Sequence, residues 1–432
     1  MPGTAPPAPR PLPALHRLAP HAYYGWFVVA GVFLLSFVSV GIGFYGQTVF
    51  LDGLIREKGW TKEAVSGAST LYFIVSGITG TLVGRSVDRW GSRTPILGGA
   101  LAMAGSLLWL GSIDRPGELY VVYAALAVGF AMTAAVPQNA ILARWFVARR
   151  AFAMSLSQTG VSLGGIVLAP LATLLIAARG IGPTTWLLAL VVLVVMLPVT
   201  TWVLRGDPAD HGLAPDGAPS PEIAPPAEHR WRARDAVRTS RFGVTALSFS
   251  LILFCQTGLS VHLLHLLRNH LSAATAASGV SLVAVGSILG RLVVGRMADR
   301  RDKRRLAAGL FAFQSMAHIA LSFAEQPATL LVATLLFGLT IGSIFMLQSL
   351  LVVELFGVAS FGTVFGLLNF VSSIGGGLGP LAVGIVAARF GGYPVALWML
   401  AVAAALGAVV VLRIPVGEER AKSGDGVDLS VP

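Results

Sequence analysis

Long apolar stretches separated by short polar segments run through most of this chain of 432 residues. Most of them approach the roughly 20 residues that a helix needs to cross the hydrocarbon core of a bilayer. Glycines, prolines and clusters of charge interrupt them, so the pattern predicts an all-α integral membrane protein with twelve transmembrane helices. We expect these helices at residues 25–47, 65–83, 95–113, 119–142, 151–177, 185–204, 243–267, 273–295, 306–323, 328–353, 361–387 and 393–413.

The composition and the placement of charge support a membrane protein. Hydrophobic residues make up 55% of the chain and charged residues only 12%, against about 25% charged in soluble domains. If both termini are cytoplasmic, 23 of the 31 Lys and Arg residues fall in cytoplasmic segments and 7 in outer loops. This asymmetry follows the positive-inside rule. The net charge of +11 is therefore expected to orient a multi-pass protein in the cell inner or plasma membrane, and no nucleic-acid partner is expected.

The chain repeats itself around a proline-rich linker. GRSVDRWGSR at 84–93 recurs as GRMADRRDKR at 295–304, and Asp88 and Asp299 lie 211 positions apart. Two pseudo-symmetric six-helix bundles, side by side, are typical of carriers that hold substrate near the membrane midplane. The predicted divisions are a disordered cytoplasmic tail at 1–22, bundles at 23–205 and 243–413, a cytoplasmic linker at 206–242 and a cytoplasmic tail at 414–432.

The motif at 84–93 resembles the signature loop of the major facilitator superfamily. Shorter stretches resemble its monocarboxylate transporter and oxalate/formate antiporter branch: YYGWFVV at the start of the first span, ARWFVARRAFAMS at 143–155, VHLLHLL at 261–267 and ELFG at 354–357. The resemblance covers residues 23–413. It implies a monomeric secondary transporter that moves a small monocarboxylate anion by alternating access, with co-transport of a proton left open.

Charged residues gather at the cytoplasmic ends of the helices in both repeats. Asp88 lies among arginines after the second span, and Asp299 takes the same place after the eighth. We expect ion pairs and helix-end contacts that hold neighbouring spans together and that break and reform as the halves rock. Charges that only fix the topology are the alternative. The candidate gating residues are Asp88, Arg89, Arg93, Arg144, Asp299, Arg300 and Glu354.

Arg291 is the candidate anion site. It lies eight residues before Asp299, or about 12 Å into the membrane. A buried arginine costs roughly 2.5–3.5 kcal/mol on insertion scales, so it is expected to face the interior and to have an anionic partner. All 20 Asp and Glu residues fall outside the span interiors, which leaves the substrate carboxylate as the simplest partner. The alternative is an architectural Arg291 that reaches Glu354 or helix-end carbonyls.

The resemblance also assigns Arg291 a role, because a span-eight arginine four residues before a glycine binds the carboxylate in the monocarboxylate transporter family. Ser287 stands where animal members have a proton-coupling aspartate, and span eleven offers Asn369 instead of a second basic residue, which favours a monoanion. His262 could carry a proton, or it could simply bond a backbone carbonyl. The candidate substrate-binding residues are Arg291, Ser287, Tyr45, His262, Asn369, Gln158 and Phe345.

Other function classes fit the sequence less well. Export of a larger amphipathic or acidic compound by the same fold is the main alternative, and a non-transporting sensor is a third. An enzyme is not expected, because the span interiors lack Asp and Glu and the chain has no HExxH motif. For the same reason no metal and no cofactor are expected.

Overall fold

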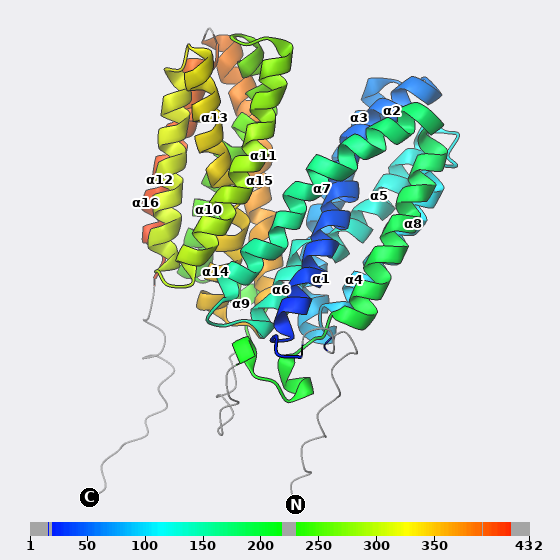
Figure 1. Cartoon of the computed structure of the whole chain (residues 1–432). Coiled ribbons are helices and arrows are strands. Elements are labelled where there is room, and N and C mark those ends of the chain that lie inside the picture. The colour runs from blue at the N-terminus through cyan, green and yellow to red at the C-terminus, as the bar shows by residue number, and fades with distance from the viewer. Residues whose placement is uncertain (1–15, 17–19, 218–229, 391, 416–432) are drawn as a thin grey trace, which may run out of the picture.

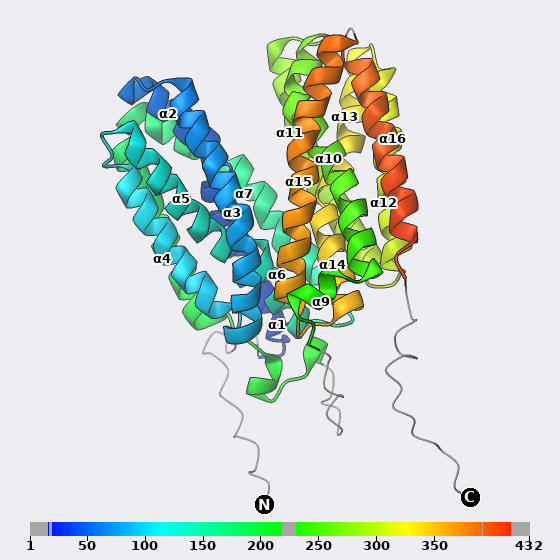
Figure 2. The ribbon, with the colours of Figure 1, turned by 180° about the vertical axis from the view of Figure 1, so that it is seen from behind.

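The helices of the protein form two groups that converge at one end and diverge toward the other (Figure 1), and the view from behind gives the same arrangement (Figure 2). The computed structural model describes residues 16, 20–217, 230–390 and 392–415, and helices are the only regular secondary structure within them. Most of the predicted tails at 1–22 and 414–432, and the middle of the linker at 206–242, lie outside the described residues.

The first half of the chain forms one of the two groups. Residues 39–44 and 199–203 of this half are π-helical and continue α1 and α8. Its α-helices are α1 (Gly25–Val38), α2 (Gly46–Lys58), α3 (Lys62–Trp90), α4 (Arg93–Leu110), α5 (Pro116–Thr133), α6 (Ala135–Trp145), α7 (Arg150–Arg179) and α8 (Ile181–Pro198).

The second half forms the other group, after a linker that contains only short helical turns. The linker elements are η4 (Pro208–His211), η5 (Pro215–Gly217) and α9 (Ala233–Val237). The helices of the second half are α10 (Ser240–Arg268), α11 (Ala273–Ala298), α12 (Lys303–Ser322), α13 (Pro327–Ile341), α14 (Ile344–Phe356), α15 (Phe361–Arg389) and α16 (Tyr393–Leu412). Contacts between the two groups run chiefly through α3 with α15 and α7 with α11.

Local sequence explains where many helices begin and end. Thr61 caps α3 by accepting a hydrogen bond from the Ala64 backbone N–H, and Thr239 caps α10 in the same way. Such a side chain satisfies one of the amide groups that the first helical turn leaves without a partner. After α3 and α7 the chain turns at Gly91 (φ 77°) and Gly180 (φ 84°), backbone conformations that favour glycine.

The exterior of both groups is apolar, as expected of a protein surrounded by lipid. Within the described residues, ten helical segments are long and apolar enough to cross a membrane, and α4 and α12 pack beside them. Leu101 on α4, Leu190 on α8 and Leu406 on α16 each leave more than half of their surface exposed. An apolar surface of this extent is unfavourable in water, so the fold is that of a multi-span membrane protein.

Several helix boundaries differ from those predicted. The predicted span at 119–142 is broken at Ala134, where the backbone is extended, and the span at 328–353 is broken by a turn at Gly342 and Ser343. Hydrophobic periodicity continues through both breaks, so it could not reveal them. The helix α3 also runs to Trp90, which puts Asp88 in its last turns instead of in a loop.

Candidate functional site

The two halves meet where α3 ends and α15 begins. The Asp88 carboxylate accepts backbone hydrogen bonds from Gly362 (2.8 Å) and Thr363 (2.7 Å), in the first turn of α15. These amides have no partner within their helix, and the partial positive charge of a helix N-terminus favours a carboxylate. Gly84 permits the approach, because a Cβ atom there would lie 2.0 Å from the Gly362 carbonyl oxygen. We call this contact the Asp88 cap.

The same contact recurs with the roles of the halves exchanged, and we call it the Asp299 cap. Asp299, at the end of α11, accepts hydrogen bonds from the Ala151 and Phe152 backbone amides at 2.7 and 3.1 Å, in the first turn of α7. The two aspartates are 211 positions apart in the sequence. The two pairs of amide donors are also 211 positions apart, but in the opposite direction. Burial raises the pKa of the Asp299 carboxyl; the two amide bonds oppose the rise, and the negative charge of Asp216 adds to it.

Two arginines near the Asp88 cap interact with residues of the first half. The Arg93 guanidinium donates to the backbone carbonyl oxygens of Thr200 (3.1 Å) and Thr201 (3.0 Å), so it ties the start of α4 to the π-helical end of α8. Arg144 interacts electrostatically with Asp88. Among the described residues Asp88 forms no ion pair, so backbone amides and a nearby positive charge hold its carboxylate.

The other predicted gating residues lie at the surface of the converging end. Glu354 pairs with Lys303 at 3.6 Å, within the second half. The Arg89 guanidinium lies over the Trp90 ring, 5.2 Å from its centroid, and Arg300 is exposed. The structure therefore brings Asp88 and Asp299 into contacts between the halves, whereas Glu354 and Arg89 make their contacts within one half.

The linker also holds one loop of each half, which the sequence did not predict. The Asp216 carboxylate accepts hydrogen bonds from the Val147, Ala148 and Arg149 amides at 2.7, 2.6 and 3.2 Å, immediately before α7. The Asp-Gly pair at 216–217 signals a tight turn, but not the loop that its carboxylate reaches.

The second linker contact is made by Trp231. Its backbone N–H donates to the Ser360 hydroxyl at 2.7 Å, immediately before α15, and its ring meets Phe356 edge-on at 5.5 Å. Asp216 and Trp231 of the linker thus bind the loops that precede α7 and α15, the two capped helices.

Arg291 lies deeper between the halves and is 5% exposed. Its Nε donates to the Gly342 carbonyl oxygen at 2.8 Å, its Nη1 to the Gln158 carbonyl oxygen of α7, and its Nη2 to the Ser287 hydroxyl at 3.4 Å. The Gln158 bond joins the second half to the first. The Gly342 carbonyl is available because the break between α13 and α14 leaves it at a helix end.

The charge of Arg291 is not neutralised by the described residues. All three of its hydrogen-bond acceptors are neutral, and no carboxylate in the described part of the chain pairs with it. A guanidinium has five N–H donors, so the three bonds leave two donors for another acceptor. An arginine with unused donors and an unpaired charge can bind a carboxylate through charge-assisted hydrogen bonds.

Two residues of the first half, Tyr45 and Gln158, lie close to Arg291. The Tyr45 hydroxyl interacts electrostatically with Arg291, and its ring lies against Gly165 of α7, where a Cβ atom would meet it at 2.7 Å. The Gln158 side-chain amide donates to Asn139 at 3.1 Å, so this residue offers its backbone oxygen and not its side chain to Arg291.

The remaining candidates lie on the second half. The Asn369 side-chain oxygen, on α15, is buried without a hydrogen-bond partner among the described residues, and Phe345 is 37% exposed. The ring nitrogens of His262 lie 3.2 Å from the Tyr393 hydroxyl and 3.0 Å from the Pro380 carbonyl oxygen. A histidine bonded to a backbone carbonyl is therefore the arrangement observed, and no contact joins His262 to Arg291.

Two related groups of apolar helices, with a buried guanidinium between them that no described carboxylate pairs with, are the arrangement of a multi-span membrane protein. The sequence model of the Major Facilitator Superfamily matches residues 33–380 and 247–428. The chain belongs to this superfamily, and it is a transporter and not an enzyme.

Similar proteins include several transporters with low sequence identity. "MFS transporter asaE" of Aspergillus flavus is 24% identical over 81% of this chain and 77% of its own length. "Monocarboxylate transporter 11" of Homo sapiens is 27% identical over 84% and 76%. "Oxalate:formate antiporter" of Oxalobacter formigenes is 27% identical over 36% and 37%. The E. coli fucose:proton symporter FucP, in its outward conformation, superposes with a TM-score of 0.71 at 16% identity, over 90% and 99% of the two chains.

Proposed function

We propose that this protein is a secondary transporter of a small monocarboxylate anion and that Arg291 binds the carboxylate. The observation that carries the proposal is the buried guanidinium of Arg291, which contacts only neutral acceptors in the described structure and lies where the two halves meet. Relatives named as a monocarboxylate transporter and an oxalate:formate antiporter support an anionic substrate. Tyr45, Ser287, Asn369, Gln158 and Phe345 would line the same site.

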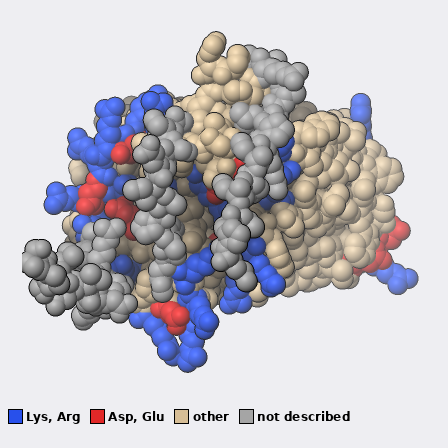
Figure 3. Space-filling model, turned by 90° about the horizontal axis from the view of Figure 1, so that it is seen from below, with Lys and Arg blue, Asp and Glu red and all other residues tan. Residues whose placement is uncertain are grey.

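The proposed topology has twelve spans and cytoplasmic termini. The halves comprise residues 23–205 and 243–413, with the linker 206–242 on the cytoplasmic side. Figure 3 supports this orientation, because Lys and Arg side chains gather on the face at the converging end, as the positive-inside rule requires of a cytoplasmic face. We place the protein in the cell inner or plasma membrane, as a monomer.

In this topology the two caps close the cytoplasmic side, and the protein faces outward. The similarity to FucP in its outward conformation supports this assignment. Transport then requires the Asp88 and Asp299 caps to break as the halves rock, with Arg93, Arg144, Arg89, Arg300 and Glu354 stabilising the helix ends around them. The bond from Arg291 to the Gln158 carbonyl also crosses between the halves. A substrate carboxylate that binds the two remaining N–H donors shares the charge of the same guanidinium, so its binding weakens the bond from Arg291 to the Gln158 carbonyl.

The test compares wild type with Arg291→Gln, and uses Arg268→Gln, an exposed arginine of the outer end, as the matched control. A panel of C2 to C6 monocarboxylates, with oxalate and succinate for contrast, is measured by thermal shift and by uptake into proteoliposomes. Loss of a charge-assisted hydrogen bond of about 2 kcal/mol predicts roughly 30-fold weaker binding in Arg291→Gln. The control is expected to bind like wild type.

An architectural Arg291 predicts a different outcome. Arg291→Gln would then lower the melting temperature but respond to the same acids as wild type, and the carboxylate proposal would fail. Proton coupling is tested in the same vesicles by imposing a pH gradient. His262 is the candidate proton carrier, so His262→Gln should abolish the dependence on the gradient if coupling runs through this side chain.

Export of a larger acidic compound is the second candidate. Phe44, Phe73 and Phe345 leave 43%, 49% and 37% of their surface exposed, and the A. flavus relative carries no monocarboxylate name. An apolar cavity with one guanidinium would suit an amphipathic acid. If long-chain or aromatic acids stabilise wild type and C2 to C6 acids do not, this function replaces the first.

A further inference from the structure

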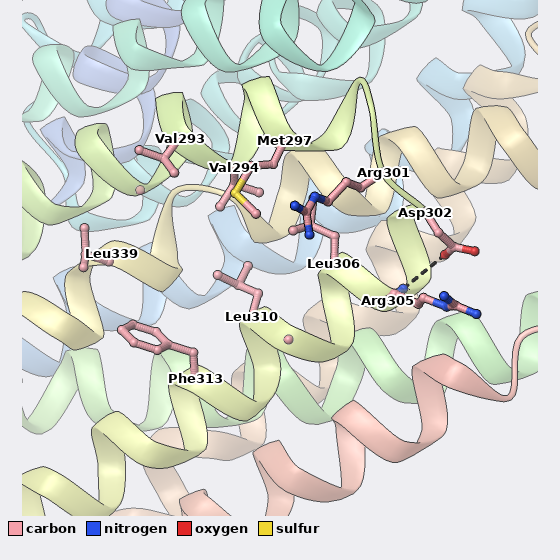
Figure 4. A pocket seen from close by; sticks show the side chains of 12 residues that line it. Val293, Val294, Met297, Arg301, Asp302, Arg305, Leu306, Leu310, Phe313 and Leu339 are labelled. Carbon is pink, nitrogen blue, oxygen red and sulfur yellow. Dashed lines mark hydrogen bonds between the residues drawn. The ribbon is translucent and has the colours of Figure 1, made fainter.

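A groove lies on the flank of the second half, away from Arg291. Its volume is about 910 Å³, and α11 and α12 form its walls. Figure 4 shows the side chains of Val293, Met297, Leu310 and Phe313 turned toward it. Val293 and Met297 are partly exposed, whereas Arg291, on the same helix, is buried. The groove therefore belongs to the outer surface of the helix bundle and not to the proposed transport site.

The groove is lined by helix contacts at its inner end and by charged residues at its other end, which we call the mouth. At the inner end Gly290 packs so closely on α13 that a Cβ atom would lie 1.9 Å from the Leu339 carbonyl oxygen. The mouth lies beyond the end of α11 at Ala298. From Gly290 to Ala298 the helix advances by eight steps, or about 12 Å, close to half of the roughly 30 Å hydrocarbon core. The groove thus has the depth of one membrane leaflet.

Two arginines lie at the mouth of the groove. Arg301 and Arg305 are exposed, and neither guanidinium has a hydrogen-bond or ion-pair partner among the described residues. Asp302, the one acidic residue of the lining, is already engaged. Its carboxylate pairs with the Arg304 side chain at 3.0 Å and caps the Arg304 and Arg305 amides. The mouth is therefore positively charged, while the rest of the lining is apolar.

We propose that this groove binds one anionic phospholipid of the cytoplasmic leaflet. An acyl chain fills the apolar part of the groove from Phe313 to Leu339, and the headgroup phosphate lies between Arg301 and Arg305. Basic pockets between transmembrane helices on the cytoplasmic side are suited to anionic headgroups. A soluble ligand would need polar groups along the groove, and these are confined to the mouth. The bound lipid would pack against α11, which carries Arg291 and ends next to Asp299.

The first test measures lipid retention by the full-length protein. Wild type and the double variant Arg301→Gln/Arg305→Gln are placed in nanodiscs that contain phosphatidylcholine and phosphatidylglycerol. Retained lipid is then counted by native mass spectrometry. The control is Arg234→Gln/Arg238→Gln, which removes two exposed arginines, one in α9 and one immediately after it. We expect wild type and the control to retain one phosphatidylglycerol molecule per chain, and the double variant to bind it about 30-fold more weakly.

The second test fills the groove without changing its charge. Gly309 lines the groove and has no atom within 4 Å of the position of a Cβ atom, so Gly309→Leu starts a side chain in open space within the groove. Gly105→Leu, at an equally open and exposed position of α4, is the control. Only Gly309→Leu is expected to lose the retained lipid.

Three results would overturn the proposal. One is equal retention of phosphatidylglycerol in the double variant and its control. Another is equal retention of phosphatidylcholine and phosphatidylglycerol by wild type, which would make the groove an unselective lipid contact. The third is a dimer that Gly309→Leu abolishes and Gly105→Leu does not, which would assign the groove to a second copy of the chain.

Discussion

The two halves of this protein are alike where they meet at the converging end and differ in the middle. Asp88 and Asp299 cap helices of the opposite half through pairs of backbone amides. Closer to the midplane, position 80 of the first half corresponds to Arg291, by the same displacement of 211 residues, and it is a glycine. Ser287 has a serine counterpart at position 76. Both halves therefore have the aspartate cap at the converging end, whereas among the described residues only the second half has a buried arginine.

Under the proposed function, this difference indicates that both halves take part in closing one face, whereas the second half alone supplies the charge that binds the anion. Closing and opening one face of a two-part carrier requires matching contacts on both halves. Recognition of a monoanion requires only one positive charge, and a second buried charge would cost roughly another 2.5–3.5 kcal/mol. The linker is also asymmetric, because a carboxylate holds the loop before α7 and a backbone amide with an aromatic ring holds the loop before α15.

The largest effect is expected from Gly84→Ala, which disturbs the Asp88 cap sterically. The new methyl group would meet the Gly362 carbonyl oxygen, and overpacking of this kind costs about 1–3 kcal/mol. We expect the cytoplasmic side to open and transport to fall at least tenfold. Spin labels on the cytoplasmic ends of the two halves would report a longer distance. The control is Gly80→Ala, where the added Cβ atom has no neighbour within 4 Å. A Gly84→Ala protein with unchanged distances would contradict the role of this contact.

A smaller effect is expected from Asp88→Asn and Asp299→Asn, which compare the two caps directly. Each substitution removes the charge but keeps one acceptor oxygen, for a loss of about 1–2 kcal/mol, or roughly 5- to 30-fold in the population of the closed cytoplasmic side. The same label distances measure this population. Equal shifts in the two variants are expected from the shared geometry. A large shift in one variant and none in the other would show that only one cap controls closure.

The smallest effect is expected from Gly80→Arg, which gives the first half the charge that it lacks. The counterpart of Arg291 in the first half would then carry a second guanidinium, and we expect the ratio of oxalate to monocarboxylate affinity to rise roughly threefold. Competition binding measures this ratio. Gly80→Gln, which is long and polar but neutral, should leave the ratio unchanged. If the glutamine variant shifts it equally, charge is not the cause.

The sequence predicted much of the helical architecture because membrane spans leave a strong signal. Apolar segments at 361–387 and 151–177 correspond to α15 and α7, which begin or end within about two residues of these limits. The breaks at Ala134 and at Gly342 were not predicted, because apolar residues continue on both sides of each break. The position of the Gly342 break matters for the site, since it provides a carbonyl for Arg291.

The sequence by itself determined which residues carry charge into the membrane and which motifs repeat. Arg291 and the two aspartates could be identified from their spacing, because an arginine within an apolar span needs a specific environment. Only the tertiary structure decided their partners. The amides that Asp88 accepts from lie 274 and 275 residues away, and the linker residue Asp216 reaches back 67 to 69 positions. Contacts over such distances depend on how whole helices pack, which no local pattern encodes.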